Sequence, residues 1–343
     1  MTDGPRLEVR EGLPEGFLDA RPETLHRLLP GPTLIHLPGR RPEPLFVAVL
    51  LHGNEPAGLE AVQALLADYR SRGLPRALSV FVGNVPAARA GRRRLPGQPD
   101  YNRIWGDDLL TPESRLARQV VEALLRRRVF ACIDVHNNTG LNPHYAIVAE
   151  LDHRHLQLAA LFGRIVVYAT TPVTTCTYRF APHCPAVTVE CGLPGQAGGA
   201  AHAREFIEAC LHLDRLPAGP VAGGDLDLYH TVAILKVPEA SSFGFGRKDV
   251  DLDLVPGMER CNFRELPAGT VLARVRPGSA ARLVAWDEAG RDASERFLER
   301  RKGEIRLRRP ATPAMFTSQE DIIRLDCLGY LMERLPWEGG GRG

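Results

Sequence analysis

The sequence predicts an α/β protein with a mainly parallel or mixed sheet flanked by helices, followed by a smaller β-rich C-terminal domain. Up to about residue 215, short continuous apolar runs alternate with segments of helical spacing, as in a sheet buried on both faces. Beyond the Gly- and Pro-rich stretch 216–224, short strand-like runs predominate. We therefore expect one domain over residues 1–215, with an irregular lead-in at 1–44, and a second over 216–343.

The expected elements of the first domain follow one another in strand–helix order. Leu45–Leu51 is an apolar run of strand length, and Glu55–Leu66 has helical spacing with Pro56 acceptable in its first turn. Further strands are expected at Leu78–Gly83, Val129–Val135, Arg164–Ala169 and Ala186–Val189, and further helices at Thr111–Leu125 and Ala201–Leu213. In the second domain we expect strands at Leu228–Val237, Val250–Leu254, Thr270–Val275, Glu304–Leu307 and Asp321–Leu325.

Composition excludes several classes of protein. Lys+Arg 43 against Asp+Glu 41 leaves a formal charge of +2, and aromatic residues make up 6%, which disfavours a dedicated nucleic-acid binder. The apolar run Phe46–Leu51 is too short to span a bilayer, and the charged start lacks the apolar region of a signal peptide. The seven cysteines include no CxxC and predict reduced thiols. We expect a cytoplasmic protein without nucleic-acid or membrane partners, and leave a homo-oligomer open.

Four polar residues each end an apolar strand: His52, Asn84, His136 and Glu190. Ligands of open α/β sheets bind outside the carboxyl ends of the strands, so we expect these side chains to converge on one edge. His52 and Glu55 stand at a strand-to-helix turn and can direct an imidazole and a carboxylate at one ion. With His136 they make His₂Glu, a ligand set of catalytic zinc that leaves a position open for water.

Two further acidic residues fit beside such an ion. Asp134, two residues before His136, can orient an imidazole. A lone carboxylate after a strand is more often a solvated residue or a helix cap. Beside zinc, however, Glu190 can take a proton from the water that attacks a carbonyl and pass it to the leaving nitrogen.

The long loop after the second strand carries the candidate substrate contacts. Arg103 can clamp a substrate carboxylate bidentately, and Asn102 can add a hydrogen bond. The run Arg92–Arg94 can hold a second anionic group, although such runs are usually only solvated.

Five motifs together resemble the succinylglutamate desuccinylase/aspartoacylase family, a branch of the zinc carboxypeptidase-like hydrolases. They are HGNEPAG (52–58), NVPA (84–87), DYNR (100–103), DVHNNTG (134–140) and VTVECG (187–192), in matching order over roughly residues 45–210. Residues 228–273 are also similar to the C-terminal β-domain of the family. DYNR departs from the commoner DLNR, and the interval from His136 to Glu190 is short for the family, which leaves the substrate's identity open.

The resemblance implies a zinc carboxypeptidase-like fold and assigns roles to particular residues. It implies that His52, Glu55 and His136 bind one Zn²⁺ and that Glu190 is the general base and acid. It implies substrate contacts from Asn102 and Arg103, with Asn84, Arg94 (from the run 92–94) and Arg179 around the pocket.

These expectations together describe a zinc-dependent amidohydrolase that deacylates a small anionic N-acyl amino acid. Two alternatives stay open. One is a carboxypeptidase-type exopeptidase that uses the same metal site, and the other is a non-catalytic metal- or ligand-binding protein on the same scaffold.

Overall fold

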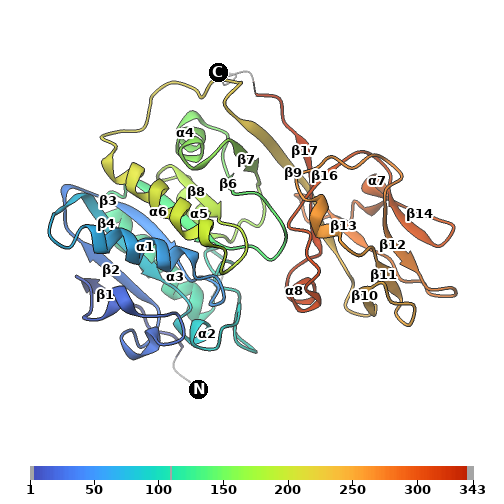
Figure 1. The fold of residues 1–343 in the computed structure, drawn as a ribbon, viewed down its shortest axis with the longest axis horizontal. Coiled ribbons are helices and arrows are strands. Elements are labelled where there is room, and N and C mark those ends of the chain that lie inside the picture. The colour runs from blue at the N-terminus through green and yellow to red at the C-terminus, as the bar shows by residue number, and fades with distance from the viewer. Residues whose placement is uncertain (1–3, 109, 338–343) are drawn as a thin grey trace. The chain divides into compact units, whose positions relative to one another are not determined.

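A computed structural model describes residues 4–108 and 110–337 of the chain (Figure 1). The chain divides into two compact units. The first contains the described residues up to Asn137, then His144–Asp227 and Trp337, and the second contains Asn138–Pro143 and Leu228–Pro336. The boundary expected after residue 215 lies in the segment that leads from the last helix of the first unit to the first long strand of the second.

The first unit is built on a mixed sheet with strand order β1-β2-β4-β3-β5-β8-β6-β7. The pairs β2–β4 and β6–β8 are antiparallel, whereas β3 runs parallel to both β4 and β5, and β5 runs parallel to β8. The strands are β1 (Glu8–Glu11), β2 (Thr33–Leu37), β3 (Gly39–Val49), β4 (Leu74–Val82), β5 (Ala131–His136), β6 (Tyr145–Val148), β7 (Ile165–Tyr168) and β8 (Ala186–Glu190). The predicted α/β fold with a mixed sheet is confirmed.

The lead-in predicted to be irregular contains two whole strands of this sheet and the first residues of β3. β1 pairs in parallel with β2, which pairs antiparallel with β4, and two 3₁₀ turns (Phe17–Asp19 and Leu25–Arg27) lie between β1 and β2. Leu34 and Ile35 of β2 are fully buried. The prediction was wrong because a strand of five residues in a Pro- and Arg-rich context shows too little periodicity to stand out.

Helices cover both faces of the sheet. They are α1 (Ala57–Asp68), α2 (Val85–Arg89), α3 (Pro112–Arg126), α4 (His153–Phe162), α5 (Cys176–Phe180) and α6 (Ala197–His212). Gly58 of α1 lies against Val135 of β5, while Thr177 of α5 is hydrogen-bonded to Thr188 of β8 at 2.9 Å. Val135 is in register with Val189, so Thr188 points to the opposite face and α1 and α5 lie on opposite sides. The carboxyl ends of the central strands are where a site can form.

The second unit is β-rich, as predicted. Its strands pair as β9 with β13, β9 with β17 and β16 with β17, and a separate sheet has the order β10-β11-β12-β15-β14. Leu252, Ile305 and Leu331 are among the buried residues of its core. The strands are β9 (Asp227–Lys236), β10 (Phe243–Phe245), β11 (Leu252–Leu254), β12 (Val271–Val275), β13 (Val284–Trp286), β14 (Leu298–Arg301), β15 (Glu304–Leu307), β16 (Thr312–Ala314) and β17 (Gly329–Arg334), with short helices at Met258–Cys261 and α7 (Ser294–Phe297).

One expected strand of the second unit is a helix. Asp321–Leu325 lies in α8 (Glu320–Leu325), because a short apolar run does not distinguish strand from helix and two acidic residues in the first turn favour the helix. All seven cysteines are free thiols, and all except Cys261 are buried. None of the helices in the described residues combines the length and apolar character that crossing a bilayer requires.

Candidate metal centre and active site

The turn after β3 brings His52 and Glu55 together through two unusual backbone positions. Leu50 follows the strand with a left-handed φ of 53°, a strained conformation for a bulky side chain. Gly53 has no room for a side chain, since a Cβ there would lie 2.2 Å from the backbone of Ala87 and Ala88. The turn is therefore packed directly on α2, and a larger residue at position 53 would displace it.

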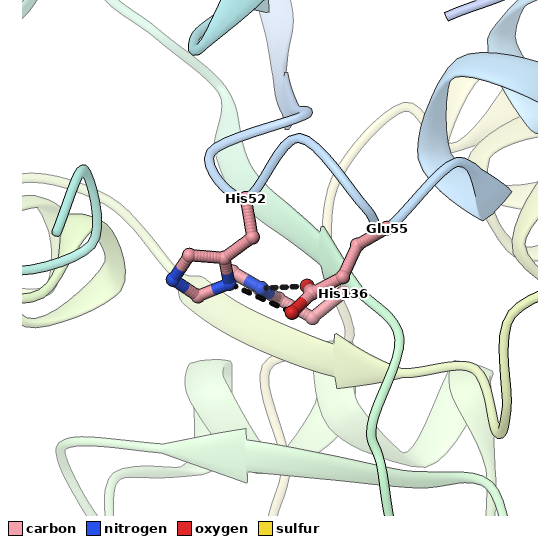
Figure 2. A group of neighbouring side chains, drawn as sticks. All are labelled: His52, Glu55 and His136. Atoms are coloured by element: carbon pink, nitrogen blue, oxygen red, sulfur yellow. Dashed lines mark hydrogen bonds and ion pairs between the residues drawn. The ribbon is translucent and has the colours of Figure 1, made fainter. Parts of the chain in front are cut away.

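Two imidazoles point at one carboxylate at this edge of the sheet (Figure 2). His52 Nδ1 lies 2.8 Å from Glu55 Oε1, and His136 Nδ1 lies 2.7 Å from Glu55 Oε2. His136 is the last residue of β5, so strand-end placement brings it to the turn as predicted. All three residues are buried, and each offers a ligand atom within 4.8 Å of the others.

The far nitrogens of the two imidazoles are also held. His52 Nε2 lies 2.9 Å from Asp100 Oδ1, and His136 Nε2 lies 3.1 Å from Asn102 Nδ2. Asp134 Oδ2 is 2.9 Å from the same His136 nitrogen, but neither Asp134 oxygen has a hydrogen-bond partner among the described residues. The predicted contact of Asp134 with His136 is thus close in distance without hydrogen-bond geometry. Such outer contacts fix the orientation of imidazoles that bind metals.

The donor set fits a divalent metal. Burial acts to raise the pKa of Glu55, but the His52 and His136 imidazoles outweigh it and hold that pKa below its ordinary value. The carboxylate is therefore ionised, as a metal ligand must be. Two imidazole nitrogens and a carboxylate oxygen are a ligand set that zinc takes in catalytic sites, where the fourth position is open for water.

Glu190 ends β8 directly opposite His136 in the β5–β8 register. The side chain is buried, and its Oε2 has no hydrogen-bond partner among the described residues. Burial raises the pKa of Glu190 to about 7, with His136 opposing that rise and Glu55 adding to it. A buried carboxyl group with a pKa near neutrality and an open oxygen is suited to accept and return a proton.

Of the three adjacent arginines, the structure brings Arg93 to the metal site, not Arg94. Arg93 Nη1 lies 3.3 Å from Glu55 Oε1, and Nη2 lies 3.0 Å from Asp100 Oδ2. The Gly53 N–H also donates to the Arg93 carbonyl at 3.2 Å, which ties the loop to the turn after β3. Arg94 Nη1 instead donates to the Gln98 carbonyl at 2.9 Å, and Arg92 is exposed.

Of the other predicted substrate residues, some lie at the site and others have structural contacts away from it. Asn102 lies at the site, and its Oδ1 accepts from the Cys176 N–H at 2.9 Å. The neighbouring Arg103 donates from Nη1 to the Asn102 carbonyl at 2.9 Å. Asn84 is fully buried and caps α2 by accepting from the Ala87 N–H at 3.2 Å.

Arg179 lies in α5 and pairs with Asp107. The roles around a substrate stay predictions for all five residues: Asn84, Arg94, Asn102, Arg103 and Arg179. Sequence reasoning missed Asp100 as a partner of His52, although its place at the head of the DYNR motif was a usable signal.

Comparisons with known proteins agree with this geometry. The family described as "Succinylglutamate desuccinylase/Aspartoacylase catalytic domain" matches residues 45–212. The chain is 28% identical over 273 residues to the succinylglutamate desuccinylase of Burkholderia lata, which covers 71% of this chain and 72% of the relative.

Two solved structures share the fold. The succinylglutamate desuccinylase of Chromobacterium violaceum has a TM-score of 0.54 at 20% identity, covering 86% of each chain. Murine aminoacylase 3 has a TM-score of 0.58 at 16% identity, covering 86% of this chain and 96% of the other. Residues 45–212 thus match the succinylglutamate desuccinylase/aspartoacylase family that the motifs of this chain resemble.

Proposed function

We propose that this chain is a zinc-dependent amidohydrolase that removes the acyl group from a small anionic N-acyl amino acid. The observation that carries the proposal is one buried arrangement. Two imidazoles share the Glu55 carboxylate, and Glu190, with an open Oε2 and a pKa raised to about 7, stands in register with one of them. The desuccinylase activity named for the relatives supports the substrate class.

His52, Glu55 and His136 would hold the metal, with Asp100 orienting His52 through Nε2. A zinc ion there supplies Lewis-acid polarisation of the scissile carbonyl and makes water more acidic, from a pKa of 15.7 toward about 7. Glu190 accepts a proton at Oε2 from the water that attacks the carbonyl carbon. It then returns the proton to the amide nitrogen, so that the C–N bond breaks and the amine leaves uncharged.

Positive charge beside this centre suits an anionic substrate. Arg93 has only 12% of its side chain exposed and lies against Glu55. In the proposal its positive charge stabilises the negative charge that develops on the carbonyl oxygen. Arg103 follows Asn102, whose amide group contacts His136 Nε2. In the proposal, Arg103 binds a carboxylate of the substrate, and Asn102 positions the part of the substrate next to the scissile bond. Because the substrate is held in place, less entropy is lost in the reaction step.

The direct test is a hydrolysis assay with zinc-loaded protein and a panel of N-acyl amino acids, including N-succinylglutamate, alongside dipeptides. We expect the N-acyl amino acids to be hydrolysed and Glu190→Gln to lower kcat by about 10²- to 10⁴-fold while the metal is retained. Glu259→Gln is the matched control, since Glu259 Oε2 is also buried and has no hydrogen-bond partner in the part of the chain that the structure describes, but lies in the second unit.

Two results would contradict the proposal. Full activity of the Glu190→Gln variant would remove the assigned base. Preferential cleavage of the dipeptides would instead identify an exopeptidase.

A further inference from the structure

Asn137 follows His136 and is 4% exposed, and its polar groups reach two separate segments of the first unit. Its Oδ1 accepts from the Ala57 N–H at 3.0 Å, and its Nδ2 donates to the Gly192 carbonyl at 3.0 Å. Its own backbone N–H donates to Glu55 Oε2 at 3.3 Å. One residue therefore contacts a metal-ligand candidate and the two chain segments that follow Glu55 and Glu190.

Each bond ends next to a residue that the proposed reaction uses. Ala57 is the first residue of α1 and lies two positions after Glu55. Gly192, with φ of +73°, lies two positions after Glu190 at the turn that leaves β8. The ladder between β5 and β8 ends nearby with the Cys191 N–H donating to the His136 carbonyl at 2.9 Å. Beyond that ladder, the hydrogen bond from the Asn137 side chain to the Gly192 carbonyl is the next connection between the two segments.

We infer that Asn137 is a positioning residue that sets the place of the general base Glu190 relative to the metal ligands. The inference rests on the proposed function, because it needs Glu190 to be the base. Oε2 of Glu190 has no hydrogen-bond partner among the described residues, so no hydrogen bond fixes that oxygen and its position depends on the backbone that carries the side chain. A misplacement of about 1 Å at such a group can cost about 10²-fold in rate.

The competing explanation is that Asn137 only satisfies buried backbone groups, as many buried asparagines do. Asn137→Asp separates the two, because the aspartate keeps an oxygen for the Ala57 N–H and loses the donor to the Gly192 carbonyl. We expect kcat to fall by about 10²-fold and KM to change by less than about threefold, with the metal retained.

Asn262→Asp is the matched control. Asn262 is also buried, and its Nδ2 and Oδ1 bond the Phe316 carbonyl and N–H at 2.9 Å each, within the second unit. Its substitution should lower stability and leave kcat unchanged.

A double-mutant cycle with Glu190→Gln gives a readout that a merely structural role would not move. If Asn137 acts through Glu190, Asn137→Asp should cause no further loss of kcat in the Glu190→Gln background. Losses that multiply in the double variant would overturn the inference. If Asn137→Asp does not fold, Asn137→Ser takes its place in the same cycle.

Hydrogen exchange of the backbone amides at 191–196 provides a measurement independent of activity. We expect faster exchange there in Asn137→Asp than in the wild type and no change in Asn262→Asp; equal exchange in wild type and Asn137→Asp would overturn the inference. Failure of the proposed function and failure of the Asn137 inference give different results. An active Glu190→Gln variant contradicts the proposed function. An impaired Glu190→Gln together with an unimpaired Asn137→Asp contradicts only the role of Asn137.

Discussion

Two groups of three histidine and carboxylate side chains in the first unit offer similar ligand atoms but have different surroundings. His52, Glu55 and His136 form one, and Glu150, Asp152 and His155 form the other. In each group the ligand atoms lie within 4.8 Å of one another. The first is buried throughout and stands beside Glu190, whereas in the second only His155 is buried.

The second group is a helix cap. Asp152 Oδ1 accepts from the N–H groups of Arg154 at 2.8 Å and His155 at 3.0 Å, and it also lies 2.9 Å from His155 Nδ1. Burial acts to raise the pKa of Asp152, but the hydrogen bonds from His155 outweigh it and hold that pKa well below its ordinary value. This carboxylate satisfies the free N–H groups at the start of α4, so the cap explains its position without a metal. We therefore expect the metal at the first group and not at the second.

The largest expected effect comes from replacing a histidine of the first group, compared with replacing the histidine of the second. His52→Ala should remove the metal and lower hydrolysis by about 10³-fold or more, because two ligands from Glu55 and His136 do not hold zinc tightly. His155→Ala should keep both the metal and the activity. Metal content after dialysis, measured by mass spectrometry, checks both variants. If only His155→Ala lost the metal, the metal site would be the second group and not the first.

A smaller loss is expected for Arg93→Ala. Its guanidinium contacts Glu55 and Asp100, so its removal should lower kcat by about 10²- to 10³-fold with the metal retained. The exposed neighbour Arg92, changed to Ala, is the control and should keep its activity. Equal effects of the two substitutions on kcat would remove the special role of Arg93.

Glu190 should destabilise the metal-free fold at high pH. Burial raises its pKa from 4.5 to about 7, so the group is protonated in the folded and unfolded states alike at low pH. Between about pH 4.5 and 7 the carboxyl group ionises in the unfolded state while the folded state keeps its proton, so the wild type loses stability that Glu190→Gln keeps, and the difference is constant above that range. In the presence of a chelator, Glu190→Gln should match the wild type near pH 4 and exceed it by about 3 kcal/mol above about pH 8.

Denaturant unfolding at a series of pH values measures this difference. A constant difference between the two proteins across the series would contradict the assigned pKa.

The smallest effect belongs to the helix cap. Asp152→Ala should lower the free energy of unfolding by about 1 kcal/mol, because the N–H groups of Arg154 and His155 lose their acceptor. The kcat of this variant should equal that of the wild type. A change in kcat or in metal content would show that the second group has a role beyond capping.

The sequence was sufficient for the metal-ligand candidates because their positions follow from strand ends. His136 closes β5 and Glu190 closes β8, and parallel pairing in register places them side by side. Thr111 was likewise readable as a helix start and does cap α3, accepting from the Ser114 N–H at 3.1 Å. In each case a local pattern and one rule of packing were enough.

Other features depend on contacts that no local pattern carries. Three consecutive arginines are equivalent in the sequence, and Arg93 is distinguished only by its contacts with Gly53, Glu55 and Asp100. The strand β2 depends on pairing with β4, and α8 depends on context because its apolar run suits either structure.

Anomalous diffraction at the zinc edge, from crystals grown with one equivalent of zinc, locates the metal in this protein. We expect a single peak about 2.0–2.2 Å from Nδ1 of His52, Nδ1 of His136 and a carboxylate oxygen of Glu55. A peak among Glu150, Asp152 and His155 instead, or none at the first group, would contradict this expectation.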